Sequence, residues 1–250
     1  MNLLEVVKDH YNRKARLAPA LIVLLPIVLV VLVLYPQLRT TAAGFASLLV
    51  SFGGLVLLTQ LGRDRGKYIE ARLFEHFGGK PSVALLRHRD TTFPILQKKR
   101  YHQFLESEAV LAPAPTAKEE ASDGRTTDDW YETASNWLLG QTRDSKRFNL
   151  LFEENVNYGF RRNLYGLKPA AMVSGLAALS AGFIKVSLRY RSTGALPTDE
   201  MIAALVGVVL YLLAFMLLVR PRWVHLASVA YAQRLLEACD ILPRSGNPAN

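Results

Sequence analysis

The chain has 250 residues, half of them apolar, and a formal net charge of +9 at pH 7. The apolar residues cluster in long runs, which is typical of a membrane protein and argues against an ordinary water-soluble domain. A single cysteine, Cys239, excludes an intramolecular disulfide framework and a zinc site built from cysteines. The basic residues fall on one side of the inferred membrane, so topology accounts for them and no nucleic-acid partner is expected.

The first apolar run covers residues 17–35 and contains no charged side chain. A helix of this length spans roughly 28 Å, about the thickness of the hydrocarbon core of a bilayer. The run is too long for a signal-peptide core, and no small-residue cleavage site precedes Tyr35. We therefore expect an uncleaved transmembrane helix, kinked at Pro26.

A second run, residues 42–61, is rich in Gly, Ala and Ser. Small residues allow helices to approach closely in lipid, so we expect this run to form an antiparallel hairpin with the first. Beyond the run, apolar residues recur at helical spacing as far as Gly78 and Gly79. This pattern predicts that the helix continues into the cytoplasm as an amphipathic stalk and stops at the two glycines.

Residues 62–168 form a polar and basic segment, which we expect to be a mainly helical cytosolic domain. Pro94 suits the first turn of one of its helices. Residues 109–123 lack apolar periodicity and are expected to be a mobile loop or linker. An acidic run from Thr126 resembles a helix N-cap, and a further helix is expected through Phe148.

Two more apolar runs, residues 169–188 and 201–219, predict a second transmembrane hairpin. Residues 223–242 read as an amphipathic helix that packs on the cytosolic domain, and residues 243–250 are expected to be disordered. The predicted fold class is an all-α membrane protein with two transmembrane helical hairpins flanking a mainly helical cytosolic domain. Its segments are 1–61 (amphipathic start and first hairpin), 62–168 (cytosolic domain), 169–219 (second hairpin) and 220–250 (cytosolic helix and tail).

The distribution of Lys and Arg predicts the orientation in the membrane. Residues 62–168 carry 18 of them, the first 17 residues carry 4 and residues 220–250 carry 4. The two turns between apolar runs carry only Arg39, and Arg189 with Arg191. By the positive-inside rule, both termini and the central segment are cytoplasmic in a multi-pass protein.

One candidate site is the run Arg87, His88, Arg89 and Asp90, with His102 further along the chain. It places an imidazole beside charge, as a general base or a phosphate contact would need. The kinase HRD motif also needs a downstream Asn and an upstream Gly-rich loop, and neither is present. We favour structural pairing of the two arginines with Asp90, while a hydrolase that uses His88 or His102 stays as a further alternative.

A second candidate site consists of Asn157, Tyr158, Arg161 and Arg162, just before the third apolar run. The arginines are suited to bind lipid head groups, or an anionic ligand through a forked guanidinium. The alternative is a solvated basic flank with aromatic residues at the membrane interface, and both readings stay open.

Other polar clusters give weaker indications of a functional site. The carboxylates from Asp123 to Glu132 match no calcium loop and suit helix capping. The sequence contains neither a nucleophile elbow nor a dinucleotide fingerprint. We therefore predict no metal, no cofactor, no catalytic residue and a non-enzymatic protein. Three further histidines lack the spacing of metal ligands: His10, His76 and His225.

Four segments carry a resemblance to known proteins: GGKPSVALLRHRD, KKRYHQFLE, LLFEENVNYGFRRNLYGLKP and YAQRLLEACD. In these the chain resembles a group of bacterial inner-membrane proteins with four membrane helices and a central cytoplasmic insert. The resemblance implies a topology and no activity. More loosely, the architecture is similar to four-helix membrane effectors of anti-phage signalling systems, which respond to a nucleotide or partner by damaging the inner membrane.

The resulting functional hypothesis is an integral inner-membrane protein whose cytosolic domain receives a signal or partner, as a membrane-disrupting effector in antiviral defence. The expected partners are membrane lipid, further copies of the chain, and either a cytosolic protein or an anionic small-molecule signal. The alternative hypothesis is a constitutive membrane anchor or scaffold for a cytoplasmic complex.

Overall fold

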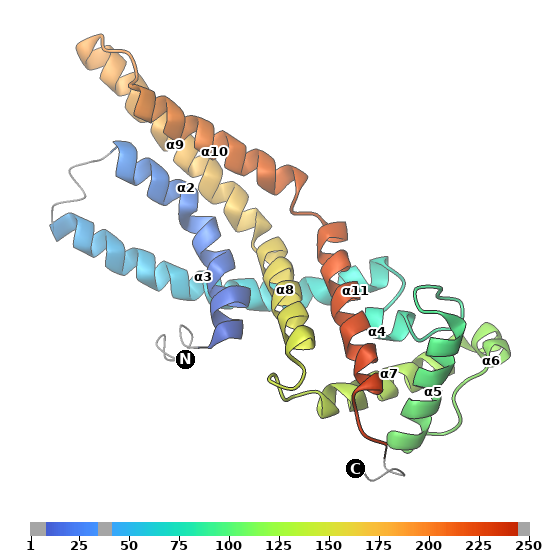
Figure 1. Cartoon of the computed structure of the whole chain (residues 1–250). Coiled ribbons are helices and arrows are strands. Elements are labelled where there is room, and N and C mark those ends of the chain that lie inside the picture. Colours follow the sequence, from blue (N-terminus) through green and yellow to red (C-terminus); the bar gives the residue numbers. More distant parts are fainter. Residues whose placement is uncertain (1–8, 35–41, 245–250) are drawn as a thin grey trace. The chain divides into compact units, whose positions relative to one another are not determined.

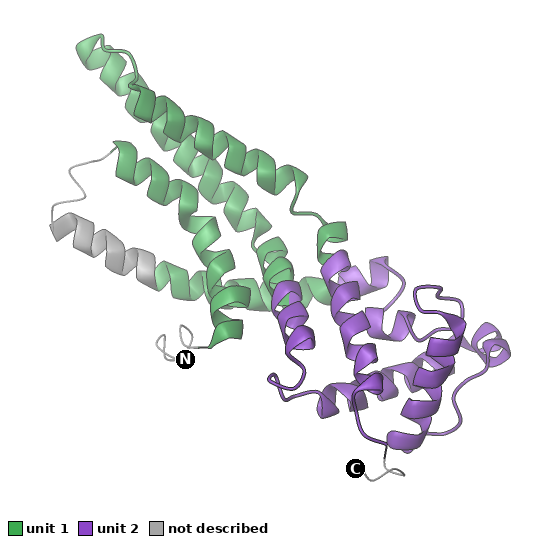
Figure 2. Cartoon of the chain, in the orientation of Figure 1, with its two compact units in different colours: residues 1–70, 159–224 green, residues 71–158, 225–250 purple. Residues whose placement is uncertain are grey.

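The computed structural model describes residues 9–34 and 42–244, and for residues 42–52 it describes the backbone alone. Every regular element in these residues is a helix (Figure 1), which confirms the all-α prediction. Arg39 and most of the predicted disordered tail lie outside the described residues. The chain forms two compact units (Figure 2): unit 1 comprises residues 1–70 and 159–224, and unit 2 comprises residues 71–158 and 225–250.

The boundaries between the two compact units follow residues 70, 158 and 224, and each lies inside a helix rather than at the end of an apolar run. The predicted boundaries at residues 61, 168 and 219 mark where a lipid-facing segment should end. Compactness measures contacts within the protein, so it does not test where lipid begins. The division into membrane and cytosolic segments therefore stays a prediction.

Unit 1 is built mainly from apolar helices. A π-helical stretch, η1, runs without a break into α2, which continues through Pro26. Helices α2, α9 and α10 pack on one another (Figure 1). The elements wholly in unit 1 are η1 (Asn12–Leu17), α2 (Ala18–Leu34), α9 (Lys168–Thr193) and α10 (Asp199–Leu217), joined by the first part of α3 (Ala42–His76) and the end of α8 (Asn149–Gly166).

Small residues of α9 make close helix contacts within unit 1. A β-carbon on Gly175 would lie 2.5 Å from Cδ2 of Leu212 on α10, so only glycine fits without a shift of that side chain. Ser174 donates a hydrogen bond from Oγ to the carbonyl of Val23 on α2, at 2.7 Å. The small residues predicted to bring helices together in lipid therefore contact other helices of the same chain.

Three described stretches are long and apolar enough to cross a membrane: Asn12–Leu34, Lys168–Thr193 and Asp199–Leu217. They coincide with most of the first and fourth predicted runs and with all of the third. The second run, residues 42–61, is helical as the start of α3, but many of its side chains lie outside the described residues. The fourth membrane span therefore stays a prediction.

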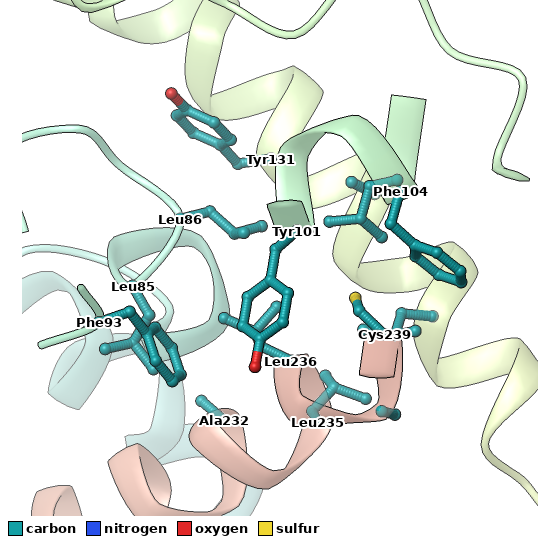
Figure 3. Close-up of a cluster of buried hydrophobic side chains, with 14 of the residues drawn as sticks. Leu85, Leu86, Phe93, Tyr101, Phe104, Tyr131, Ala232, Leu235, Leu236 and Cys239 are labelled. Atoms are coloured by element: carbon teal, nitrogen blue, oxygen red, sulfur yellow. The ribbon is translucent and has the colours of Figure 1, made fainter. Parts of the chain in front are cut away.

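Unit 2 is a helical domain with one apolar core (Figure 3). Tyr101 and Leu105 of α5, Tyr131 of α7 and Leu235 of α11 are among its fully buried side chains. The C-terminal helix thus packs on the central segment, as its amphipathic pattern predicts. The elements of unit 2 are α4 (Pro81–Ala84), α5 (Ile95–Glu108), α6 (Ala117–Ser122), α7 (Gly124–Gln141) and η3 (Ala238–Asp240), with the end of α3, the start of α8 and most of α11 (Pro221–Glu237).

Two local predictions in unit 2 are wrong. Residues 109–123, expected to be a loop, contain α6, which opens with a capping box between Thr116 and Glu119. Helix α7 starts at Gly124 rather than near Thr126, because the Asp123 carboxylate accepts hydrogen bonds from the first free amides of the helix. Caps satisfy backbone donors without any apolar periodicity, so a search for periodicity misses both features.

Candidate functional site

Arg87 follows α4 and is buried. Its guanidinium pairs with the Asp128 carboxylate through two bonds, Nε to Oδ1 at 2.8 Å and Nη2 to Oδ2 at 2.6 Å. Nη1 donates to the carbonyl of Gly78 at 2.6 Å. The hydrogen bonds to Asp128 raise the pKa of Arg87 despite its burial. The structural pairing expected for Arg87 is present, but its partner is Asp128 on α7 rather than Asp90.

Glu120 organises the turn that carries His88 and Arg89. Its carboxylate accepts from the backbone N–H of His88 at 2.7 Å and from the Tyr131 hydroxyl at 3.0 Å, and it lies 4.0 Å from Nε of Arg89. Burial opposes the charged form, but these donors still lower the pKa of Glu120. The His88 imidazole is bonded through Nε2 to the carbonyl of Pro115, at 2.7 Å.

His102 of α5 is buried and lies next to His88, with 5.1 Å between the ring centroids. Its Nε2 is bonded to the carbonyl of Leu86 at 2.8 Å. A carbonyl only accepts, so Nε2 of each histidine carries the hydrogen and Nδ1 is an acceptor in the neutral ring. Burial lowers the pKa of His102, which favours the neutral form.

Lys98 is buried beside the two histidines. Its Nζ donates to the carbonyls of Arg87 at 2.6 Å and Asp90 at 2.5 Å and lies 3.8 Å from the Asp90 carboxylate. Desolvation lowers the pKa of Lys98. This lysine fastens the turn after α4 to helix α5.

A cavity of about 900 Å³ opens beside α5 in unit 2. It is lined by the turn before α5, by one face of α5 and by residues 114–117. Cavities of this size hold small molecules in many proteins. Of the first candidate site, His88 and Asp90 line it, together with His102, which was named further along the chain.

The second predicted site is divided between the two units. Asn157 and Tyr158 belong to unit 2, where Asn157 contacts Glu154 and the Tyr158 ring stacks on Tyr231. Arg161 and Arg162 belong to unit 1 and are described next. The ligand role proposed for this group stays a prediction.

Both arginines of that group have partners within unit 1. Arg161 lies over the Trp223 ring, 5.0 Å from the centroid, and donates to the Trp223 carbonyl at 3.1 Å. Arg162 is buried and pairs with Glu70 on α3 at 2.9 Å. Each arginine donates through Nη1, and the contact of Arg161 with the Trp223 ring gives one reason why an arginine and an aromatic residue occur together here.

The arrangement in unit 2 is suited to binding. The cavity lining contains the imidazoles of His88 and His102, the exposed Lys99 and apolar side chains. Its hydroxyl groups are those of Thr91 and Thr116. Within the described residues, no three side chains of His, Cys, Asp or Glu gather as metal ligands. Sequence reasoning missed Phe93, Ile95 and Lys99 of the lining. The available signal was the spacing of residues 95, 99, 102 and 106 on one face of α5.

Comparison with protein-family models, curated protein sequences and solved structures found no match to this chain.

Proposed function

We propose that this chain is an integral membrane protein in which unit 1 carries the membrane-spanning helices and unit 2 belongs to a cytosolic domain that receives a signal. The observation that carries the proposal is the cavity beside α5, which holds two imidazoles and an exposed lysine. It lies in the unit that contains none of the three apolar stretches, so a water-soluble signal would reach it from the cytosol.

The exposed apolar surface of unit 1 supports the membrane placement. Leu25 on α2, Phe183 on α9 and Leu210 on α10 are all exposed in the single chain. Further large apolar side chains on these three helices are exposed as well, and lipid tails or further copies of the chain would cover them. In its finer form the proposal has four membrane helices in two hairpins, residues 17–61 and 169–219, in a bacterial inner membrane.

Cysteine labelling tests the topology. In a Cys239→Ala background, Ser192→Cys at the end of α9 and Lys118→Cys on α6 present one exposed thiol each. A membrane-impermeant maleimide should label the first in intact cells and the second only after permeabilisation. Labelling of Lys118→Cys in intact cells would reverse the proposed orientation.

The proposed output is damage to the membrane in antiviral defence. Helices α3, α8 and α11 each belong to both units, so the chain passes from the signal-receiving unit to the apolar unit without a loop at these points. Phage infection of cells that express the chain with its neighbouring genes should depolarise them, as read by a membrane-potential dye. A chain with the cavity filled by Ala114→Trp should not respond. An unchanged potential in both strains counts against the effector role.

A constitutive scaffold is the second candidate, and one observation favours it. Ile95 and Leu96 at the start of α5 are 86% and 82% exposed, as expected for residues that contact a partner protein. This function predicts a stoichiometric partner in a pull-down that Leu96→Lys removes, with no effect on membrane potential. Recovery of the same proteins with and without the substitution would argue against it.

A further inference from the structure

Most charged groups that line the cavity beside α5 are already satisfied by the protein. Lys98 donates to two backbone carbonyls. Asp90 accepts from the backbone N–H of Thr92 at 2.9 Å, and Glu106 accepts from that of Ala114 at 3.0 Å. These contacts hold the walls of the cavity together, and Lys98 and Asp90 are engaged with each other and with the backbone. Glu106 keeps further acceptor positions.

Two polar side chains at the same cavity are available to bind a ligand. Lys99 and Gln103 lie one turn apart on α5, both exposed, and neither has a hydrogen-bond or ion-pair partner among residues 9–34 and 42–244. A cation without a counter-ion beside an amide suits a carboxylate or another oxyanion. Beside Gln103 the cavity therefore offers a ligand the positive charge of Lys99, two turns of α5 before the carboxylate of Glu106.

The imidazoles add acceptors. His88 and His102 use Nε2 to donate to backbone carbonyls, so in the neutral ring Nδ1 carries the lone pair. His102 stays neutral near pH 7 because burial lowers its pKa. A ligand that carries an N–H or O–H group would satisfy one of these acceptors.

Apart from Thr91 and Thr116, the remaining lining is apolar. It includes Phe93, Ile95 and Pro115, and Ile95 is almost fully exposed in the single chain. Covering an apolar side chain removes its surface from water, which favours binding. An apolar body in the ligand would match this surface.

Building on the signal-receiving role proposed above, we infer that the cavity binds a small organic acid with an apolar body and a hydrogen-bond donor. Its oxyanion would lie at Lys99 and Gln103, its apolar body against Phe93 and Ile95, and its donor would face an imidazole Nδ1. This assignment differs from the earlier expectation, which placed an anionic ligand at Arg161 and Arg162.

Three related probes test the inference. Indole-3-acetate has the aromatic body, the N–H donor and the carboxylate, 1-methylindole-3-acetate lacks the donor, and indole-3-acetamide lacks the charge. Binding to the full chain in lipid nanodiscs would be measured by ligand-observed NMR, with empty nanodiscs as the control for partition into lipid. Loss of the donor should weaken binding about three- to tenfold, and loss of the charge about two- to fivefold, the latter less at high salt.

Matched variants locate the binding. Lys99→Ala should weaken indole-3-acetate and leave the amide unchanged, whereas Lys118→Ala, an exposed lysine outside the lining, should change neither. His88→Ala should remove part of the preference for the N–H probe. Equal affinity for all three probes, no binding of any at millimolar concentrations, or no effect of Lys99→Ala overturns the inference. These outcomes are independent of the cysteine labelling and of the depolarisation assay, so failure of the ligand class is distinguishable from failure of the proposed function.

Discussion

The pair between Arg87 and Asp128 should contribute much more to the stability of unit 2 than the more exposed pair between Lys80 and Glu132. The Arg87 side chain is only 9% exposed and the Asp128 side chain 36%, and two short hydrogen bonds join them. Arg87→Met would leave the Asp128 carboxylate without its partner and the Gly78 carbonyl without a donor. Both losses act on the junction between the end of α3, α4 and α7.

The magnitude follows from burial. Removing one partner of a fully buried pair costs about 3–5 kcal/mol, but Asp128 recovers part of this from water, so we expect about 2–3 kcal/mol for Arg87→Met. The coupling energy in a double-mutant cycle with Asp128→Asn should be about 1–2 kcal/mol, because the hydrogen bonds are charge-assisted. The pair between Lys80 and Glu132 is the matched control, since its atoms are 3.5 Å apart and its side chains are 29% and 55% exposed. Its coupling should be about 0–0.5 kcal/mol.

Unfolding in urea, followed by tryptophan emission, measures both cycles. Trp130 and Trp137 belong to unit 2 and Trp223 belongs to unit 1, so a Trp223→Phe background confines the signal to unit 2. Equal coupling energies for the two pairs would refute the reasoning from burial. A larger coupling energy for the pair between Lys80 and Glu132 would also refute it.

Lowering the pH from about 7.5 to about 5.5 should destabilise unit 2, because burial lowers the pKa of His102 and of His225 and the unfolded chain therefore takes up protons first. His102→Asn should flatten this dependence, and an unchanged slope in urea unfolding would contradict it. Gly166→Ala should destabilise unit 1 by about 1–3 kcal/mol, since its β-carbon would lie 2.8 Å from a backbone nitrogen of α3. A β-carbon at Gly140 on α7 would meet no atom within 4 Å, so Gly140→Ala should instead stabilise unit 2 by about 0.5–1 kcal/mol. Shifts of the melting temperature with the same sign in both variants would be inconsistent with this packing. Burial raises the pKa of Cys239 to about 12, so iodoacetamide should alkylate the native thiol far more slowly than the thiol in urea, and similar rates would show that it is accessible.

Helices with strong local signals could be predicted from the sequence. Pro94 indicates the start of α5, and Gly78 and Gly79 mark the end of α3, where both adopt the positive φ angles that favour glycine. The three apolar stretches were predicted because a span of lipid requires a long uncharged run. In each of these cases the determining residues are neighbours in the chain.

The candidate site was less predictable because it depends on residues far apart in the sequence. Arg87 and Asp128 are 41 positions apart, and nothing local distinguishes Asp128 from Asp129 as the partner. The cavity forms only when residues 114–117 lie beside α5, so Lys99 and Gln103 read in the sequence as ordinary surface residues. His88 was predicted from its charged neighbours, although the structure uses those neighbours to hold the turn in place.

The most direct test of the account is the environment of the two units in a bilayer. Spin labels at Phe183→Cys on α9 and at Lys118→Cys on α6, each in a Cys239→Ala background, would be measured in the full chain in nanodiscs. Oxygen concentrates in the hydrocarbon and a nickel chelate stays in water, so their relaxation effects report which medium surrounds each label. We expect strong oxygen and weak nickel relaxation at residue 183, and the reverse at residue 118. Equal nickel relaxation at both positions would contradict the placement of unit 1 in the membrane.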